Sequence, residues 1–153
     1  MDYTDGASVT NQALRLTLHN NLDELGRLAS ELETFCALHG LGPKVLNALN
    51  LALEEVVTNV ISYGFDDGEV HDIAVSLEMR GGELTASVED DGAAFDPLSK
   101  ADPDVEASID DRRIGGLGVL LVKRLMDDVT YARIDGRNVL SMRKRLSASD
   151  AVV

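Results

Sequence analysis

The stretch LALEEVVTNVISYGF, residues 51–65, has the apolar spacing of a buried helix but carries three polar side chains, Glu54, Glu55 and Asn59. Pro43 upstream suits the first turn of such a helix, where no N–H is needed for a helical hydrogen bond. Apolar residues then recur three and four positions apart, on one seam that faces the core; they are Leu46, Leu49, Leu53, Val56 and Val60. At about 100° per residue, Glu55 and Asn59 lie one helical turn apart at the margin of that seam.

Two interpretations of this polar pair are open. A carboxamide oxygen suits a hard cation such as Mg²⁺, and a neighbouring carboxylate can accept a proton or position a nucleophile. Alternatively, Glu54 and Glu55 are solvated charges beside the seam, and Asn59 makes a local hydrogen bond. The helix by itself favours the second interpretation, because surface charges beside an apolar seam are common.

The rest of the chain predicts one α+β domain. The expected elements are a strand at 13–18, a helix at 22–39 capped by Asn20 or Asn21 and ended by Gly40, the helix from 43, strands at 73–79 and 84–88 around an RGGE turn, a helix from 116, and a hairpin of 129–134 and 139–146. This order predicts a two-layer sandwich over residues 11–146, with helices on one face of a mixed, largely antiparallel sheet. Residues 1–10 and 147–153 lack apolar periodicity, and we expect them to be flexible.

Charge and hydropathy narrow the classes of partner. The chain has 27 acidic and 14 basic residues and a net charge of −13, which disfavours direct binding to nucleic acid or to an anionic membrane surface. No apolar run approaches the ~20 residues that span a bilayer, and the first residues do not resemble a signal peptide. The expectation is a cytoplasmic protein without a membrane anchor.

The cysteine and the histidines are not expected to form a site. Cys36 is the only cysteine, and its place in a helical apolar pattern predicts a core thiol rather than a nucleophile. His19, His39 and His71 are too widely separated for metal-ligand spacing, and we expect each to be a surface or turn residue.

A second informative segment is VEDDGAAFDP, residues 88–97. Here an apolar strand ends in several carboxylates, Asp90 among them, followed by Gly92. Carboxylates at the end of a strand can bind a base or a metal, but an acidic turn with a glycine is also an ordinary way to leave a strand. The segment alone does not distinguish these interpretations.

The third segment is RRIGGLGVLLVK, residues 112–123. Its glycines stand at a helix start, where exposed amides and the helix dipole favour phosphate. The pattern lacks the GK[ST] of a P-loop and the third glycine of a dinucleotide fingerprint. A flexible hinge before a packed helix is the alternative.

Taken in order, the three segments resemble the GHKL superfamily of ATP-binding domains, the Bergerat or histidine-kinase-like ATPase fold. The helix EEVVTNVISYGF is similar to its N box, DDGAAFDP to its first glycine box, and GGLGVLLVKRLMDD to its second. Within the superfamily the chain most resembles the anti-sigma-factor serine/threonine kinases of the RsbW and SpoIIAB type. The resemblance covers roughly residues 11–146.

The resemblance implies a role for each matching residue. Glu55 would be the catalytic base, Asn59 would hold Mg²⁺ against the phosphates, and Asp90 would accept a hydrogen bond from the adenine amino group beside Gly92. The phosphates would lie against the backbone of the residues Gly115, Gly116, Leu117 and Gly118. Ala94 stands where the family pattern has its second glycine, which is a departure that restricts the backbone there.

The loop at about 95–114 would be a lid over ATP, with Arg112 or Arg113 as a possible phosphate contact. The implied function is an ATP- and Mg²⁺-dependent protein serine/threonine kinase that is also an anti-sigma factor. It would phosphorylate a serine of an anti-sigma antagonist of the STAS type and sequester a sigma factor, as a bacterial cytoplasmic homodimer. The alternative is a non-catalytic, nucleotide-gated protein-binding module.

Overall fold

The computed structural model describes residues 7–9, 13–99, 116–147 and 150. Its helices and strands follow the order β1 (Ala7–Val9), β2 (Ala13–His19), η1 (Leu22–Glu24), α1 (Leu25–Leu38), α2 (Pro43–Tyr63), β3 (Asp72–Arg80), β4 (Glu83–Asp90), η2 (Pro97–Ser99), α4 (Gly116–Leu125), β5 (Asp128–Ile134) and β6 (Arg137–Arg145). None of the helices in these ranges is long and apolar enough to cross a membrane.

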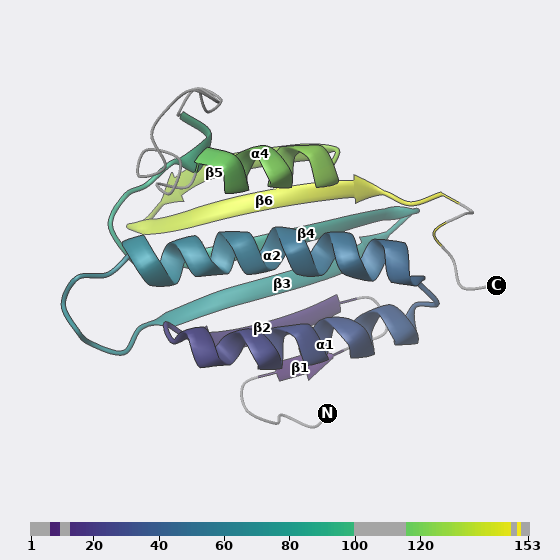
Figure 1. Cartoon of the computed structure of the whole chain (residues 1–153), viewed down its shortest axis with the longest axis horizontal. Helices are drawn as coiled ribbons and strands as arrows, with labels where there is room; N and C mark the ends of the chain where they lie inside the picture. The colour runs from purple at the N-terminus through teal and green to yellow at the C-terminus, as the bar shows by residue number, and fades with distance from the viewer. Residues whose placement is uncertain (1–6, 10–12, 100–115, 148–149, 151–153) are drawn as a thin grey trace.

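In the described part of the chain, six strands form one sheet in the order β1-β2-β3-β4-β6-β5. Every pairing between them is antiparallel. Helices α1, α2 and α4 lie on the same face of this sheet (Figure 1). The predicted α+β two-layer fold is confirmed, and the sheet is antiparallel throughout its described part rather than mixed.

The helix boundaries follow the local signals in the sequence. Asn21 caps η1, because its side-chain oxygen accepts a hydrogen bond from the backbone N–H of Asp23 at 2.9 Å. Helix α1 ends just before Gly40, whose φ of 65° suits a residue without a side chain. Helix α2 starts at Pro43 and runs for 21 residues to Tyr63.

The core lies between the helices and one face of the sheet. Alternate residues of β2, β3, β4 and β6 are buried there against the apolar seams of α1 and α2. Phe35 and Cys36 belong to this core, as predicted for the cysteine, and burial raises the pKa of the Cys36 thiol to about 11.

Two described segments near the ends of the chain make contacts that the sequence pattern did not predict. Ala7–Val9 pairs with Leu14–Leu16 of β2, although three residues are too few to show a strand pattern. Near the other end Asp150 is buried, and its carbonyl oxygen accepts a hydrogen bond from the backbone N–H of Gly42 at 2.7 Å. The lid expected at about 95–114 falls mostly on 100–115, outside the described residues.

Candidate functional site

A cleft opens between α2 and the neighbouring strands β4, β6 and β5, with η2 and α4 at its rim. Glu55 and Asn59 of α2 both line it, and so does Asp90 at the end of β4. The structure therefore brings together the predicted site residues of the first two sequence segments that the resemblance connected. Asp90 lies more than 30 positions along the sequence from either residue of α2.

The position of Glu55 follows from the packing of α2. Val56 and Val57 are buried in the core. Because these valines face the core, the side of the helix next to them faces the cleft. Glu55 is half-buried on that flank, whereas its neighbour Glu54 is exposed and does not line the cleft. Asn59, one turn further along, is half-buried on the same flank.

Asp90 is held in place at the bottom of the cleft, with only 3% of its surface exposed. Its Oδ1 atom accepts hydrogen bonds from the backbone N–H of Gly92 at 2.9 Å and from Nδ2 of Asn138 at 3.0 Å. Among the described residues these bonds engage Oδ1 and leave Oδ2 as the oxygen available to a ligand.

Position 92 needs a glycine because the backbone at Gly64 approaches it too closely to leave room for a side chain. A Cβ built on it would lie 2.5 Å from the carbonyl oxygen of Gly64, which follows α2. The same carbonyl accepts a hydrogen bond from the N–H of Ala93 at 3.0 Å. Ala94 is exposed and does not line the cleft.

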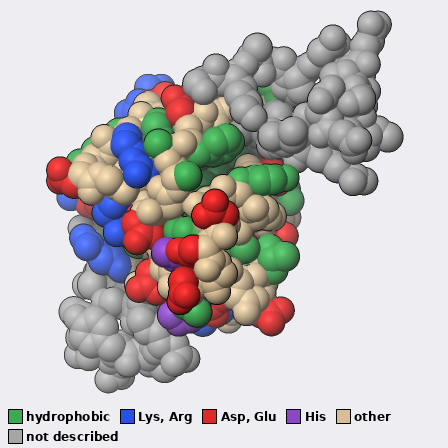
Figure 2. Space-filling model, turned by 90° about the vertical axis from the view of Figure 1, so that its left-hand side faces the viewer, with side chains coloured by type: hydrophobic (Ala, Val, Ile, Leu, Met, Phe, Trp, Pro, Cys, Tyr) green, Lys and Arg blue, Asp and Glu red, His purple; other side chains and the backbone are tan. Residues whose placement is uncertain are grey.

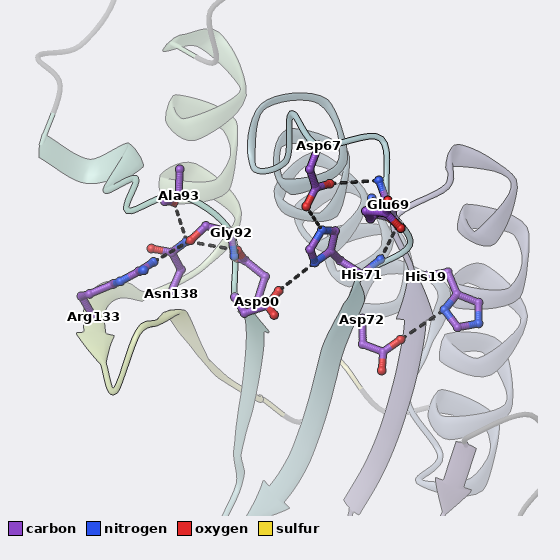
Figure 3. A network of polar contacts seen from close by, with 12 residues as sticks. His19, Asp67, Glu69, His71, Asp72, Asp90, Gly92, Ala93, Arg133 and Asn138 are labelled. Carbon is purple, nitrogen blue, oxygen red and sulfur yellow. Dashed lines mark hydrogen bonds and ion pairs between the residues drawn. The ribbon is translucent and has the colours of Figure 1, made fainter.

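The sequence analysis missed three residues of the β5–β6 hairpin that support this turn. Asn138 also donates to the carbonyl oxygen of Ala93 at 2.9 Å, and its Oδ1 accepts from the hydroxyl of Tyr131. Arg133 donates from Nη1 to the carbonyl oxygen of Gly92 at 2.8 Å (Figure 3). No local pattern marks these residues, because the stretch around them has only the alternation of a strand.

The walls of the cleft are largely apolar. Valine and leucine side chains from α2, β4, β5, β6 and α4 surround the polar residues; among them are Val56, Val60, Val88, Val122, Val129 and Leu140. An apolar slot with one buried carboxylate at its base suits a flat heterocycle that carries a hydrogen-bond donor.

The third segment is described only in part. Gly116, Leu117 and Gly118 form the first turn of α4, where backbone N–H groups are free of helical partners. Gly115, Arg112 and Arg113 lie outside the described residues. The remainder of α4 reaches the cleft through Val122.

The donor atoms in the cleft fit Mg²⁺. Asn59 supplies an amide oxygen on the flank of α2 that lines the cleft, and Mg²⁺ in nucleotide sites takes one or two protein oxygens together with phosphates and water. Within the described ranges no three His, Cys, Asp or Glu side chains are grouped to hold a metal by themselves.

The end of the molecule beside the cleft is acidic. Figure 2 shows Asp and Glu side chains gathered there around histidines. His19 is exposed and pairs with Asp72 at 3.2 Å, while His39 packs against Phe35 at the end of α1 with the two rings tilted by 47°. His71 is largely enclosed within its loop, so it is not a simple surface residue.

Comparison with known proteins agrees with the resemblance found in the sequence. Residues 18–144 match the model of the histidine kinase-like ATPase domain family. The serine/threonine-protein kinase BtrW of Bordetella bronchiseptica is 33% identical over 94 residues, which cover 61% of this chain and 66% of that protein. The serine-protein kinase RsbW of Listeria monocytogenes is 31% identical over 120 residues, 76% of this chain and 75% of that protein.

A solved structure supports the fold. The crystal structure of the RsbU and RsbW domains of Rv1364c from Mycobacterium tuberculosis superposes with a TM-score of 0.65 at 19% identity. The match covers 92% of this chain but only 34% of that one, so the chain spans about a third of the larger protein.

Proposed function

This chain belongs to the histidine kinase-like ATPase domain family, and from that premise we propose that it is an ATP-dependent protein serine/threonine kinase. The observation that carries the proposal is the convergence of Glu55, Asn59 and Asp90 on one cleft. The names of its relatives BtrW and RsbW, both protein kinases, support the same reaction.

The adenine end of the cleft recognises the base. Oδ2 of Asp90 accepts a hydrogen bond from the exocyclic amino group, while the apolar walls enclose the ring. Because Oδ1 is already engaged by Gly92 and Asn138, the carboxylate cannot rotate freely. This arrangement selects a base that donates at that position.

The other end of the cleft handles the phosphates. Asn59 would hold Mg²⁺ against the polyphosphate, where the ion would offset part of the negative charge, and the backbone at the start of α4 binds the phosphate oxygens. Glu55 accepts the proton of a serine hydroxyl as that oxygen attacks the γ-phosphorus. The bond from the γ-phosphorus to the bridging oxygen breaks, so ADP leaves and phosphoserine remains on the partner.

The partner proteins follow from the same proposal. The substrate serine belongs to a STAS-type anti-sigma antagonist, and the kinase sequesters a sigma factor when that antagonist is phosphorylated. The chain acts as a homodimer in the bacterial cytoplasm. The similarity to RsbW of Listeria supports this role.

The test combines nucleotide binding with phosphoryl transfer. Calorimetric titration with ATP and ADP, with and without Mg²⁺, is compared between the unchanged protein, Asp90→Asn and Glu89→Gln. In Asp90→Asn an amide nitrogen takes the place of Oδ2 and faces the adenine amino group donor to donor, so binding should be lost. Glu89→Gln changes a neighbouring acid that pairs with Arg137 instead, and it should bind normally.

Transfer is then measured with ATP labelled at the γ-phosphate and a STAS-type protein encoded near the gene. Labelled phosphoserine on that protein supports the kinase. Nucleotide binding without transfer to any such protein would favour the nucleotide-gated binding module. Absence of binding under every condition would overturn the proposal as a whole.

A further inference from the structure

The turn that carries Asp90 is held from a second side, by the loop between α2 and β3. This loop, residues 64–71, begins with the carbonyl oxygen of Gly64 that accepts from Ala93. It ends with His71, whose imidazole pairs with the carboxylate of Asp91. The loop therefore connects the helix of Glu55 and Asn59 to the turn of the base-binding carboxylate.

The imidazole of His71 lies between two carboxylates from different segments. Its Nε2 is 2.7 Å from Oδ2 of Asp67, in the same loop, and its Nδ1 is 3.4 Å from Oδ1 of Asp91, in the turn after β4. Its ring stacks on Phe65, with ring centroids 4.1 Å apart and planes 8° apart. Only a doubly protonated ring can donate to both carboxylates at once.

The backbone of His71 is anchored independently of these contacts. Its N–H donates to Oδ1 of Asn20 at 2.8 Å, and its carbonyl oxygen accepts from the N–H of Asn20 at 3.1 Å. Asn20 also donates from Nδ2 to the carbonyl oxygen of Glu69 at 3.1 Å. Because the loop is tied to the end of β2 in this way, a change at the imidazole acts on Asp91 rather than on the loop.

We propose that His71 is a positioning residue for nucleotide recognition: its doubly protonated imidazole holds Asp91, and through it the turn of Asp90 and Gly92, in the orientation that accepts the base. The proposal rests on the proposed nucleotide site. It adds a residue that touches neither the base nor the phosphates and makes nucleotide affinity depend on pH.

The direction of the pH dependence follows from the charges that face the ring. These are Asp67 from its own loop and Asp91 from the turn after β4, while Phe65 and Asn20 contribute neutral groups. The hydrogen bond to Asp67 is the largest cause that raises the pKa of His71, and Asp91 adds to it. The link is therefore complete at pH values below the ordinary histidine range and is lost as pH rises through the raised pKa.

The experiment measures the Kd of ATP with excess Mg²⁺ at several pH values for the unchanged protein and for His71→Gln. ATP itself titrates near neutrality, so the quantity compared is the ratio of the two Kd values at each pH. We expect His71→Gln to bind about two- to fivefold more weakly at the acidic end, as for a partly exposed ion pair. Above the raised pKa the ratio should approach one.

The matched control is His19→Gln. His19 also pairs with an aspartate, Asp72, at the same end of the protein, but this pair joins β2 to β3 rather than to the turn after β4. Its Kd ratio should stay near one at every pH. Asp91→Asn should reproduce the loss seen in His71→Gln, and the double variant should be no worse than either single variant, because both remove one interaction.

A second readout needs no nucleotide. The backbone amide resonances of Gly92 and Ala93 should shift with pH along the titration curve of His71, and this shift should disappear in His71→Gln. If ATP binds but the Kd ratio is flat with pH, or if His19→Gln behaves like His71→Gln, the positioning role is overturned while the nucleotide site stands. If the amides titrate with His71 but no ATP binds at any pH, the proposed function fails and the link between His71 and the turn stands.

Discussion

Asn138 and Asp90 stand directly opposite each other on β6 and β4, and the side-chain amide of Asn138 donates to Oδ1 of Asp90 at 3.0 Å. The same amide donates to the carbonyl oxygen of Ala93 at 2.9 Å. One buried side chain thus orients the carboxylate and supports the turn that follows it.

Asn138→Ala should weaken both the fold and the site. It leaves a buried carboxylate oxygen and a carbonyl without one partner each, so the free energy of unfolding should fall by about 1–3 kcal/mol. The Kd of ATP should rise about tenfold, because the carboxylate is no longer fixed. Ser141→Ala, on the other face of the same strand, should change neither; an equal effect in both variants would show only general damage to β6.

Glu55→Gln should separate chemistry from binding. The substitution removes the proton acceptor but keeps the shape of the side chain, so phosphoryl transfer should fall by roughly 10²–10⁴-fold. The Kd of ATP, measured by calorimetry, should change little. Glu54→Gln is the control, since Glu54 is exposed beside it. Loss of ATP binding in Glu55→Gln would assign this residue to nucleotide binding instead of proton transfer.

Gly92→Ala should disturb the junction between α2 and the turn. Its Cβ would lie 2.5 Å from the carbonyl oxygen of Gly64, so one of the two backbones must move. We expect a lower melting temperature and weaker ATP binding. Gly26→Ala, within α1 and with open space around it, should instead stabilise the protein by up to about 1 kcal/mol. Normal ATP binding by Gly92→Ala would show that the close approach is not needed.

Cys36 should be unreactive in the folded protein. Burial raises the pKa of its thiol to about 11, so only about one molecule in a thousand carries a thiolate at pH 8. A chromogenic disulfide reagent at pH 8 should modify native protein slowly and protein in denaturant at once. Because the chain has one cysteine, the signal belongs to Cys36, and rapid labelling of native protein would contradict its place in the core.

The local spacing of apolar residues was sufficient to predict most helices and strands of the fold. Helical and extended geometry alone decide which side chains point the same way. This is enough to predict the apolar seam of α2 and the buried side of the strand that contains Leu14, Leu16 and Leu18. The same geometry separated Glu55 from Glu54 before any contact was known. The strand Ala7–Val9 was not predicted, because three residues are too few to show the alternation of a strand.

These local patterns did not predict the residues that hold the site in place. Asn138 lies 48 positions from Asp90, and His71 lies 20 positions from Asp91. Nothing in the residues around Asn138 distinguishes it from any polar residue in a strand, and His71 looked like a turn residue. Their roles depend on which strand lies beside β4 and on how the loop after α2 folds back.

By itself the sequence determined the helical face that carries Glu55 and Asn59, the longer strands with their buried sides, and the three motifs of the ATPase family. These features are set by interactions between residues close along the chain. Only the tertiary structure decided that β6 pairs with β4 in the register that puts Asn138 opposite Asp90, and that His71 reaches Asp91. Strand order and register result from burying the whole core at once, so no single segment encodes them.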